Sequence, residues 1–154
     1  MVVLDCNGKV ASTVSSGGIA LKQPGRVGQA SVFGCGCWAQ RGNPSKSSYT
    51  VGISTTGCGE HLVRTFLAKE CAMHLRTSRR PLLSLQNCMK EKFAESDFLS
   101  KYPHRRIHGQ IRYILCFILQ TGCQRSLAVP FACITTRPTE KVSFCGLTLQ
   151  PLWD

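Results

Sequence analysis

Two short stretches near the start of the chain begin with apolar residues and flank a turn signal. Residues 2–5 and 10–15 lie on either side of the pair Asn7-Gly8. An Asn-Gly pair favours a tight hairpin turn because both residues adopt positive φ at low cost. The pattern therefore predicts that the chain begins with a β-hairpin.

The part of the chain that follows this hairpin is mostly polar. Residues 16–47 are rich in Gly, Ser, Pro and Lys, which predicts a long loop across an active-site face, with a short apolar segment at residues 30–33. Apolar and polar residues alternate at residues 48–54, which predicts a strand. The apolar positions of that strand are Tyr49, Val51 and Ile53.

Apolar residues recur at three-to-four spacing from Glu60 onward, which predicts an amphipathic helix that ends before Pro81. Pro81 suits the first turn of a second helix, because a backbone N–H there would have no helical partner in any case. The apolar positions of the first helix are Leu62, Val63, Phe66, Leu67, Cys71 and Leu75, and those of the second are Leu82, Leu85, Met89 and Phe93.

Beyond the second helix, residues 99–154 are expected to supply further strands of the same domain. Residues 129–136 and 142–147 predict a closing hairpin. Pro130 would confine the first of these strands to a sheet edge or a bulge, because proline cannot donate to the ladder. The whole pattern predicts an α+β fold with an antiparallel sheet and a helical pair.

Length and composition fit one globular domain. Of the 154 residues, 43% are apolar and 18% are charged, which is ordinary for a folded protein. No apolar run reaches the length of about 18 residues that spans a bilayer, and residues 1–6 lack the basic start of a signal peptide. We therefore expect a protein with no membrane association, located inside the cell in the cytoplasm or the nucleus.

Ten cysteines could indicate zinc sites or a disulfide scaffold. Their spacing does not support either, since Cys35 and Cys37 form a C-x-C pair and no C-x-x-C motif occurs. Free thiols are expected inside the cell, where cysteines stay reduced. The sequence predicts no metal site and no cofactor.

The formal net charge of +11 raises the alternative of a basic nucleic-acid-binding protein. The 19 Lys and Arg residues are spread along the chain, and their local clusters have no interleaved aromatic residues and no recognition-helix pattern. A solvated basic face is the preferred interpretation, and nucleic acid is not the expected partner. The clusters are Arg76, Arg79 and Arg80, and Arg105 with Arg106.

A polar loop spaced by glycines runs directly into the first predicted helix at residues 54–65. Glycines let the backbone approach a ligand, and free N–H groups at a helix start carry partial positive charge. Such a loop suits the stabilisation of an oxyanion. Two other glycine-rich segments lie upstream, at residues 14–30 and 34–39.

These three segments resemble, in order and spacing, the β-subunit of the threonine aspartase (taspase) branch of the asparaginase-type N-terminal-nucleophile hydrolases. The resemblance covers residues 1–98 and weakens in residues 99–154. It implies part of a four-layer αββα sandwich, in which this chain supplies half of the central sheet and one helical layer. It also implies a threonine-type endopeptidase that cleaves polypeptides after aspartate.

The resemblance assigns roles to individual residues. Thr56 and Gly57 stabilise the tetrahedral oxyanion through a hydroxyl and a backbone N–H, and Ser16 orients the nucleophile. Arg26 grips a substrate carboxylate with its planar guanidinium. Gly59 belongs to the substrate-binding loop. Considered without the resemblance, Thr56 or Gly59 would simply start the helix, and Ser16 would satisfy its own turn.

Gln29 bears on the choice of substrate. Asparaginases and isoaspartyl peptidases carry an aspartate at this position, which holds the amino group of a small substrate. A neutral Gln29 favours an aspartate within a polypeptide over a free amino acid, and so implies protein substrates with Asp at the cleavage site.

The nucleophile of the resembled family is an N-terminal threonine whose own α-amine acts as the base. It would lie a few residues before Met1, so we expect a truncated β-subunit that is inactive alone. Its expected partner is an α-subunit-like chain or an intact taspase homologue. Two alternatives stay open: a non-catalytic modulator of an intact taspase subunit, and a hydrolase of the asparaginase or isoaspartyl peptidase kind.

Overall fold

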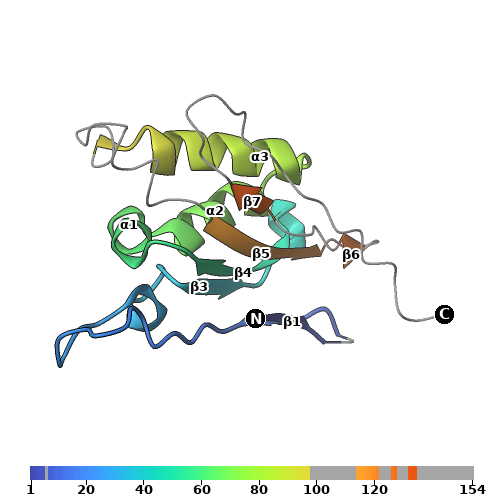
Figure 1. The fold of residues 1–154 in the computed structure, drawn as a ribbon. Coiled ribbons are helices and arrows are strands. Elements are labelled where there is room, and N and C mark those ends of the chain that lie inside the picture. The colour runs from blue at the N-terminus through green and yellow to red at the C-terminus, as the bar shows by residue number, and fades with distance from the viewer. Residues whose placement is uncertain (6, 98–113, 122–125, 128–131, 135–154) are drawn as a thin grey trace.

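The computed structural model describes residues 1–5, 7–97, 114–121, 126–127 and 132–134. They form an α+β fold with three layers, in which helices cover one side of a five-stranded sheet and a two-stranded hairpin covers the other (Figure 1). The described layers are compatible with part of an asparaginase-type fold, while the four-layer αββα sandwich stays an expectation.

The predicted N-terminal hairpin is confirmed. Strands β1 (Val2–Leu4) and β2 (Val10–Ser12) pair antiparallel. The turn between them is held by Asp5, whose Oδ1 accepts hydrogen bonds from the backbone N–H groups of Asn7 at 2.9 Å and Lys9 at 2.7 Å. The hairpin is thus specified by local turn chemistry.

The second sheet is antiparallel and centred on β4. It runs in the order β3, β4, β5, β6, with β7 also paired to β5. The predicted strand at residues 48–54 is confirmed, although it begins and ends two residues later. The strands are β3 (Cys37–Gln40), β4 (Thr50–Thr56), β5 (Ile114–Thr121), β6 (Ser126–Leu127) and β7 (Ala132–Ile134).

Strand β3 corrects the prediction of one loop over residues 16–47. It lies within the polar, glycine-rich part of the chain and pairs with β4, with Trp38 opposite Ile53. Two short 3-10 turns, Gln29–Ser31 and Pro44–Lys46, flank it. A strand of four residues stabilised by a distant partner leaves little alternation in the sequence, which is why the pattern did not reveal it.

The single helix predicted after Glu60 is divided in two. Helices α1 (Gly59–Thr65) and α2 (Leu67–Arg76) meet at Phe66, which adopts the left-handed conformation with φ of 47°. A bulky residue rarely takes this conformation, so no local pattern indicates the break. The change of direction lets Leu62 and Leu67, on either side of the break, both enter the core.

Helix α3 (Pro81–Cys88) begins at Pro81 as predicted and continues into a π-helical turn, Met89–Ala94. Leu85, Met89 and Phe93 are buried against α2, in agreement with the predicted stripe. The core between helices and sheet consists of Val51, Ile53, Leu62, Leu67, Ala68, Cys71, Ala72, Leu75, Leu85, Cys88, Met89 and Phe93.

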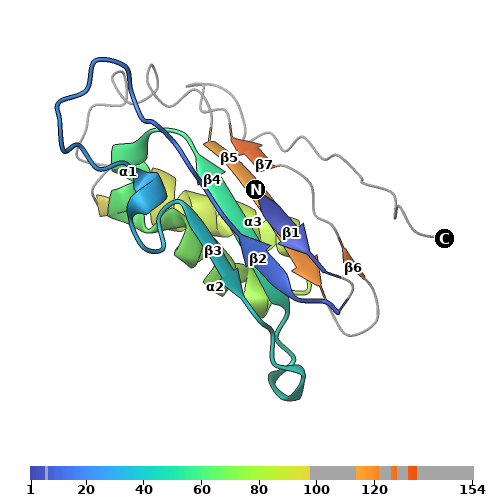
Figure 2. The same cartoon turned by 90° about the horizontal axis from the view of Figure 1, so that it is seen from below.

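The hairpin packs on the face of the sheet opposite the helices. Figure 2 shows β1 and β2 lying over the sheet strands and running in about the same direction, with the following loop extending to the side of α1. The amino group of Met1 donates to the carbonyl of Thr13 at 2.8 Å and to Ser54 Oγ at 3.2 Å, and the hydroxyl of Ser12 donates to the carbonyl of Ile53. The bonds to Ser54 and Ile53 join the hairpin to β4.

Most of the segment expected to supply further strands lies outside the described residues. Within the described residues, β5 pairs with β4 and β7 pairs with β5. The predicted strand at 142–147, Pro130 and the Arg105–Arg106 cluster fall outside the described part. The boundary at residue 98 therefore stays a prediction.

None of the described helices is both long and apolar enough to cross a lipid bilayer.

Gly52 on β4 is predicted to be essential for the contact between the two sheets. A Cβ at this position would lie 2.6 Å from Val2 Cγ1 and closer still to Val10 Cγ1. Gly52→Ala should therefore lower the free energy of unfolding by about 1–3 kcal/mol, the usual cost of overpacking. Urea denaturation would measure it, with Gly17→Ala as the control because no atom lies within 4 Å of a Cβ there. Equal stability of the two variants would contradict the packing described here.

Candidate functional site

A cavity of about 380 Å³ lies where two segments far apart in the sequence meet. The loop after β2, which leads into the turn at Gln29–Ser31, forms one wall, and the junction of β4 with α1 forms the other. All six site residues named from the sequence line it: Ser16, Arg26, Gln29, Thr56, Gly57 and Gly59. Isolated loop residues would not be expected to converge in this way.

Gln29 is tightly packed between neighbouring segments of the chain. The residue is 7% exposed. A Cβ on Gly59 would lie 2.8 Å from Gln29 Oε1, and a Cβ on Gly36 would lie 2.8 Å from the Gln29 carbonyl oxygen. Two stretches of glycine backbone therefore pack closely against one residue, which fixes the turn at Gln29 relative to the start of α1.

The junction between β4 and α1 presents Thr56 and Gly57 at the cavity. Thr55 is buried, and its hydroxyl bonds to the carbonyls of Cys35 at 2.9 Å and Gly36 at 3.1 Å. Because side chains alternate along a strand, anchoring Thr55 inward leaves Thr56 exposed on the opposite side. The cavity thus receives a hydroxyl and a glycine backbone at the end of a rigid strand.

Ser16 takes part in a local turn and also lines the cavity. Its Oγ accepts a hydrogen bond from the backbone N–H of Gly18 at 3.1 Å. This is the turn-satisfying role that the sequence alone allowed. A serine hydroxyl has one donor and two acceptor positions, so Ser16 retains bonding capacity toward the cavity.

Arg26 is paired with Glu60 at the cavity wall. Its Nη2 donates to Glu60 Oε1 across 34 positions of sequence. The second oxygen of the carboxylate accepts a hydrogen bond from the Cys58 thiol, with 3.4 Å between Sγ and Oε2. The side chains of Arg26 and Glu60 are 40% and 56% exposed. The pair is therefore worth less than about 1 kcal/mol to the fold, and its larger consequence is for ligand binding.

The pKa of Glu60 lies below its ordinary value. The main cause is a hydrogen bond from its own backbone N–H at the start of α1, followed by the Cys58 thiol and the Arg26 charge. Burial raises the pKa of the Cys58 thiol, which keeps that thiol protonated as a donor. At neutral pH the cavity therefore contains an ionised carboxylate beside its arginine.

Three residues of α1 belong to the cavity wall but were not identified from the sequence: Glu60, Val63 and Arg64. Their positions i, i+3 and i+4 place them on one helical face, and that spacing was the available signal. Ile19 and Val27 add apolar surface and are 58% and 67% exposed. The cavity thus combines two arginines, one carboxylate and a small apolar rim.

The basic cluster proposed for nucleic acid lies away from this cavity. Arg79 and Arg80 are exposed in the turn between α2 and α3, which Figure 1 shows at the opposite end of the helical layer from α1. Within the described residues, no group of three His, Cys, Asp or Glu could hold a metal ion.

Residues 1–98 match the family described as Asparaginase. This chain belongs to that family. The match supports the asparaginase-type family predicted from the sequence. It does not distinguish the threonine-aspartase branch within that family.

Characterised relatives share the same part of the chain. It is 38% identical over 71 residues to an isoaspartyl peptidase of Escherichia coli, covering 46% of this chain and 20% of the relative. It is 36% identical over 81 residues to an isoaspartyl peptidase/L-asparaginase of Xenopus laevis, covering 52% and 24%. It is 41% identical over 67 residues to a plant-type L-asparaginase of Pyrobaculum calidifontis, covering 44% and 20%. The chain spans about a fifth to a quarter of the length of these relatives.

The pKa of Glu60 provides a direct test of the electrostatics at the cavity. A carboxyl titration followed by NMR should place it below the ordinary value of 4.5. Because the depressed pKa stabilises the folded state only while the carboxylate is ionised, this small contribution is present at neutral pH and lost as the pH falls through the folded value.

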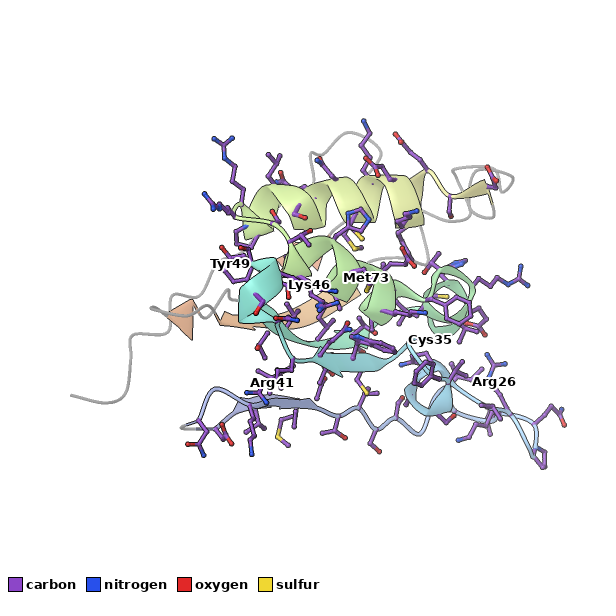
Figure 3. The ribbon with its side chains drawn as sticks, turned by 180° about the vertical axis from the view of Figure 1, so that it is seen from behind. Arg26, Cys35, Arg41, Lys46, Tyr49 and Met73 are labelled. Atoms are coloured by element: carbon purple, nitrogen blue, oxygen red, sulfur yellow. The ribbon has the colours of Figure 1, made fainter. Side chains whose placement is uncertain are left out.

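The Arg26→Ala variant should shift the Glu60 pKa only part of the way back toward 4.5, since the backbone N–H is the largest cause. Arg41→Ala is the matched control, because Figure 3 shows Arg41 at the opposite end of the molecule from Arg26. An unchanged pKa in Arg26→Ala would show that the ion pair does not form in solution.

Proposed function

We propose that the cavity is the substrate-binding part of an asparaginase-type amide hydrolase site. The observation that carries the proposal is the convergence of six residues from two distant segments on one cavity. Arg26 binds a carboxylate of the substrate, while Thr56 and Gly57 receive the oxygen of the amide carbonyl. Membership of the asparaginase family supports this choice over nucleic-acid binding.

The proposed chemistry follows from the groups at the cavity. A guanidinium presents two parallel N–H donors that match a carboxylate. The Thr56 hydroxyl and the Gly57 N–H are donors for the negative charge that develops on a carbonyl oxygen during attack. Loss of one such donor typically costs about 3 kcal/mol in the transition state. Arg26 thus orients the substrate, and the β4–α1 junction stabilises the reacting oxygen.

The nucleophile in this proposal is an N-terminal threonine, which combines a hydroxyl with a free amine. The proposal assigns that residue to another segment or chain and includes an α-subunit-like partner. The exposed side chains of Met1 and Val3 on the hairpin, 68% and 47% accessible, leave apolar surface for such a partner. A chain that binds ligand without turning it over is the expected behaviour of residues 1–154 alone.

Two substrate classes fit the site, and different observations favour them. The named relatives are isoaspartyl peptidases and L-asparaginases, which favours asparagine or β-aspartyl peptides. Gln29 is neutral where such enzymes are expected to hold the substrate amine with an aspartate, which favours an aspartate within a polypeptide, as in the threonine-aspartase branch. The two classes differ in whether the bound residue carries a free amine.

Binding of succinate, a dicarboxylate without an amine, tests the role of Arg26. Arg26→Ala should weaken succinate binding at least about tenfold, because a hydrogen bond to a charged group contributes about 1.5–3 kcal/mol. Glu60→Gln should tighten binding, since it removes the carboxylate that occupies Arg26. Isothermal titration would measure both, with Arg41→Ala as the control. Equal affinity of Arg26→Ala and Arg41→Ala would refute the assignment.

The Gln29→Asp variant distinguishes the substrate classes. A carboxylate at this position should increase affinity for L-aspartate about tenfold through a charge-assisted bond to the ligand amine. Affinity for N-acetyl-aspartate, which has no charged amine, should not increase. If Gln29→Asp changes the affinity for L-aspartate and for N-acetyl-aspartate by the same factor, residue 29 does not contact the ligand amine. If the unmodified chain already prefers L-aspartate strongly, the polypeptide interpretation is wrong.

A further inference from the structure

Cys71 and Cys88 face each other between the two packed helices α2 and α3. Their Sγ atoms are 3.9 Å apart, and both side chains are fully buried. The Sδ atom of Met89 lies 3.8 Å from Cys71 Sγ. Three sulfur atoms are thus gathered in one part of the hydrophobic core, outside the residues that line the cavity.

The two thiols are positioned for a covalent reaction with each other. We propose that Cys71 and Cys88 form a reversible disulfide that ties α2 to α3. The present separation exceeds a disulfide bond by about 2 Å, so a small movement of each side chain brings the sulfurs together. Met89 can follow that movement, because its unbranched thioether adapts to changes in the shape of a core.

Oxidation requires an electron acceptor, and a small disulfide such as oxidised glutathione supplies it. One cysteine loses its proton, and its thiolate attacks the oxidant, forming a mixed disulfide and releasing one glutathione thiolate. The second cysteine then loses its proton, and its thiolate attacks the protein sulfur and releases the second glutathione. One S–S bond breaks, one forms, and the two protons lost by the cysteines are taken up by the two glutathione thiolates.

Burial controls the rate of this reaction. Neither sulfur is exposed in the closed helix pair, so exchange proceeds when α3 separates locally from α2. Once formed, the bond joins residues 17 positions apart and restricts the unfolded chain, which stabilises the folded state. The disulfide therefore acts on the helical layer and is independent of the proposed ligand site.

The test uses the full chain treated with oxidised glutathione, followed by alkylation of remaining thiols and peptide mass mapping. The Cys71–Cys88 linkage should be the dominant disulfide in the native chain, while oxidation of the chain in guanidinium should give a mixture. The Tm of the oxidised chain should rise by at least about 5 °C and return on reduction. Native oxidation that leaves Cys71 and Cys88 alkylated, or that links them no more often than in guanidinium, would overturn the proposal.

Single variants separate this bond from effects of the other cysteines. Cys71→Ala and Cys88→Ala should each lose the rise in Tm on oxidation, whereas Cys37→Ala, which alters a half-buried cysteine of β3, should keep it. A rise that persists in both Cys71→Ala and Cys88→Ala would assign the stabilisation to another pair. Peptide mass mapping of the oxidised, unsubstituted chain identifies the linked cysteines even if an alanine variant folds poorly.

Discussion

The close packing of glycine backbone around Gln29 is the constraint on which the site depends. Gly36 lies against the carbonyl of Gln29, and Gly59 lies against its side-chain oxygen. A side chain at Gly36 would collide with backbone atoms of Gln29 and Ala30 and displace the turn, whereas one at Gly59 would displace the side-chain amide of Gln29. The arrangement of the cavity walls therefore depends on backbone that approaches the turn more closely than ordinary residues permit.

Strand β4 connects this constraint to the rest of the fold. Val51 and Ile53 enter the core under α2, while Gly52 on the opposite face accepts the N-terminal hairpin. At its end, Thr55 is bonded inward and Thr56 faces the cavity. One strand thus carries the packing of both layers and delivers the proposed oxyanion donors at a fixed position.

In the proposed site, Glu60 competes with a ligand carboxylate for Arg26. The chain carries a net charge of +11, yet Arg26 is already paired with Glu60. Under the proposal, a ligand carboxylate replaces that of Glu60, and a ligand that also engages Thr56 and Gly57 is preferred. Selectivity would then come from the geometry of several groups and less from overall charge.

Local chemistry made part of this architecture predictable. The hairpin follows from Asn7-Gly8, and the start of α3 follows from Pro81, because each signal acts within a few residues. Strand β3 and the break at Phe66 depend on distant packing and left no local pattern.

The resemblance named six residues between Ser16 and Gly59, and the structure places all six at one cavity, while their roles stay predictions. Glu60 was missed because its partner lies 34 positions away and no spacing rule links them. A pattern along the chain identifies turns and helix starts, whereas contacts between distant loops emerge only when the fold brings those loops together.

A crystal structure of the chain with succinate bound would show directly whether Arg26, Thr56 and Gly57 form one ligand site. We expect one carboxylate on the Arg26 guanidinium in place of Glu60, and an oxygen of the other end of the ligand within hydrogen-bond distance of Thr56 Oγ1 and the Gly57 N–H. Succinate bound elsewhere, or bound in the cavity with the Arg26–Glu60 pair intact, would contradict it.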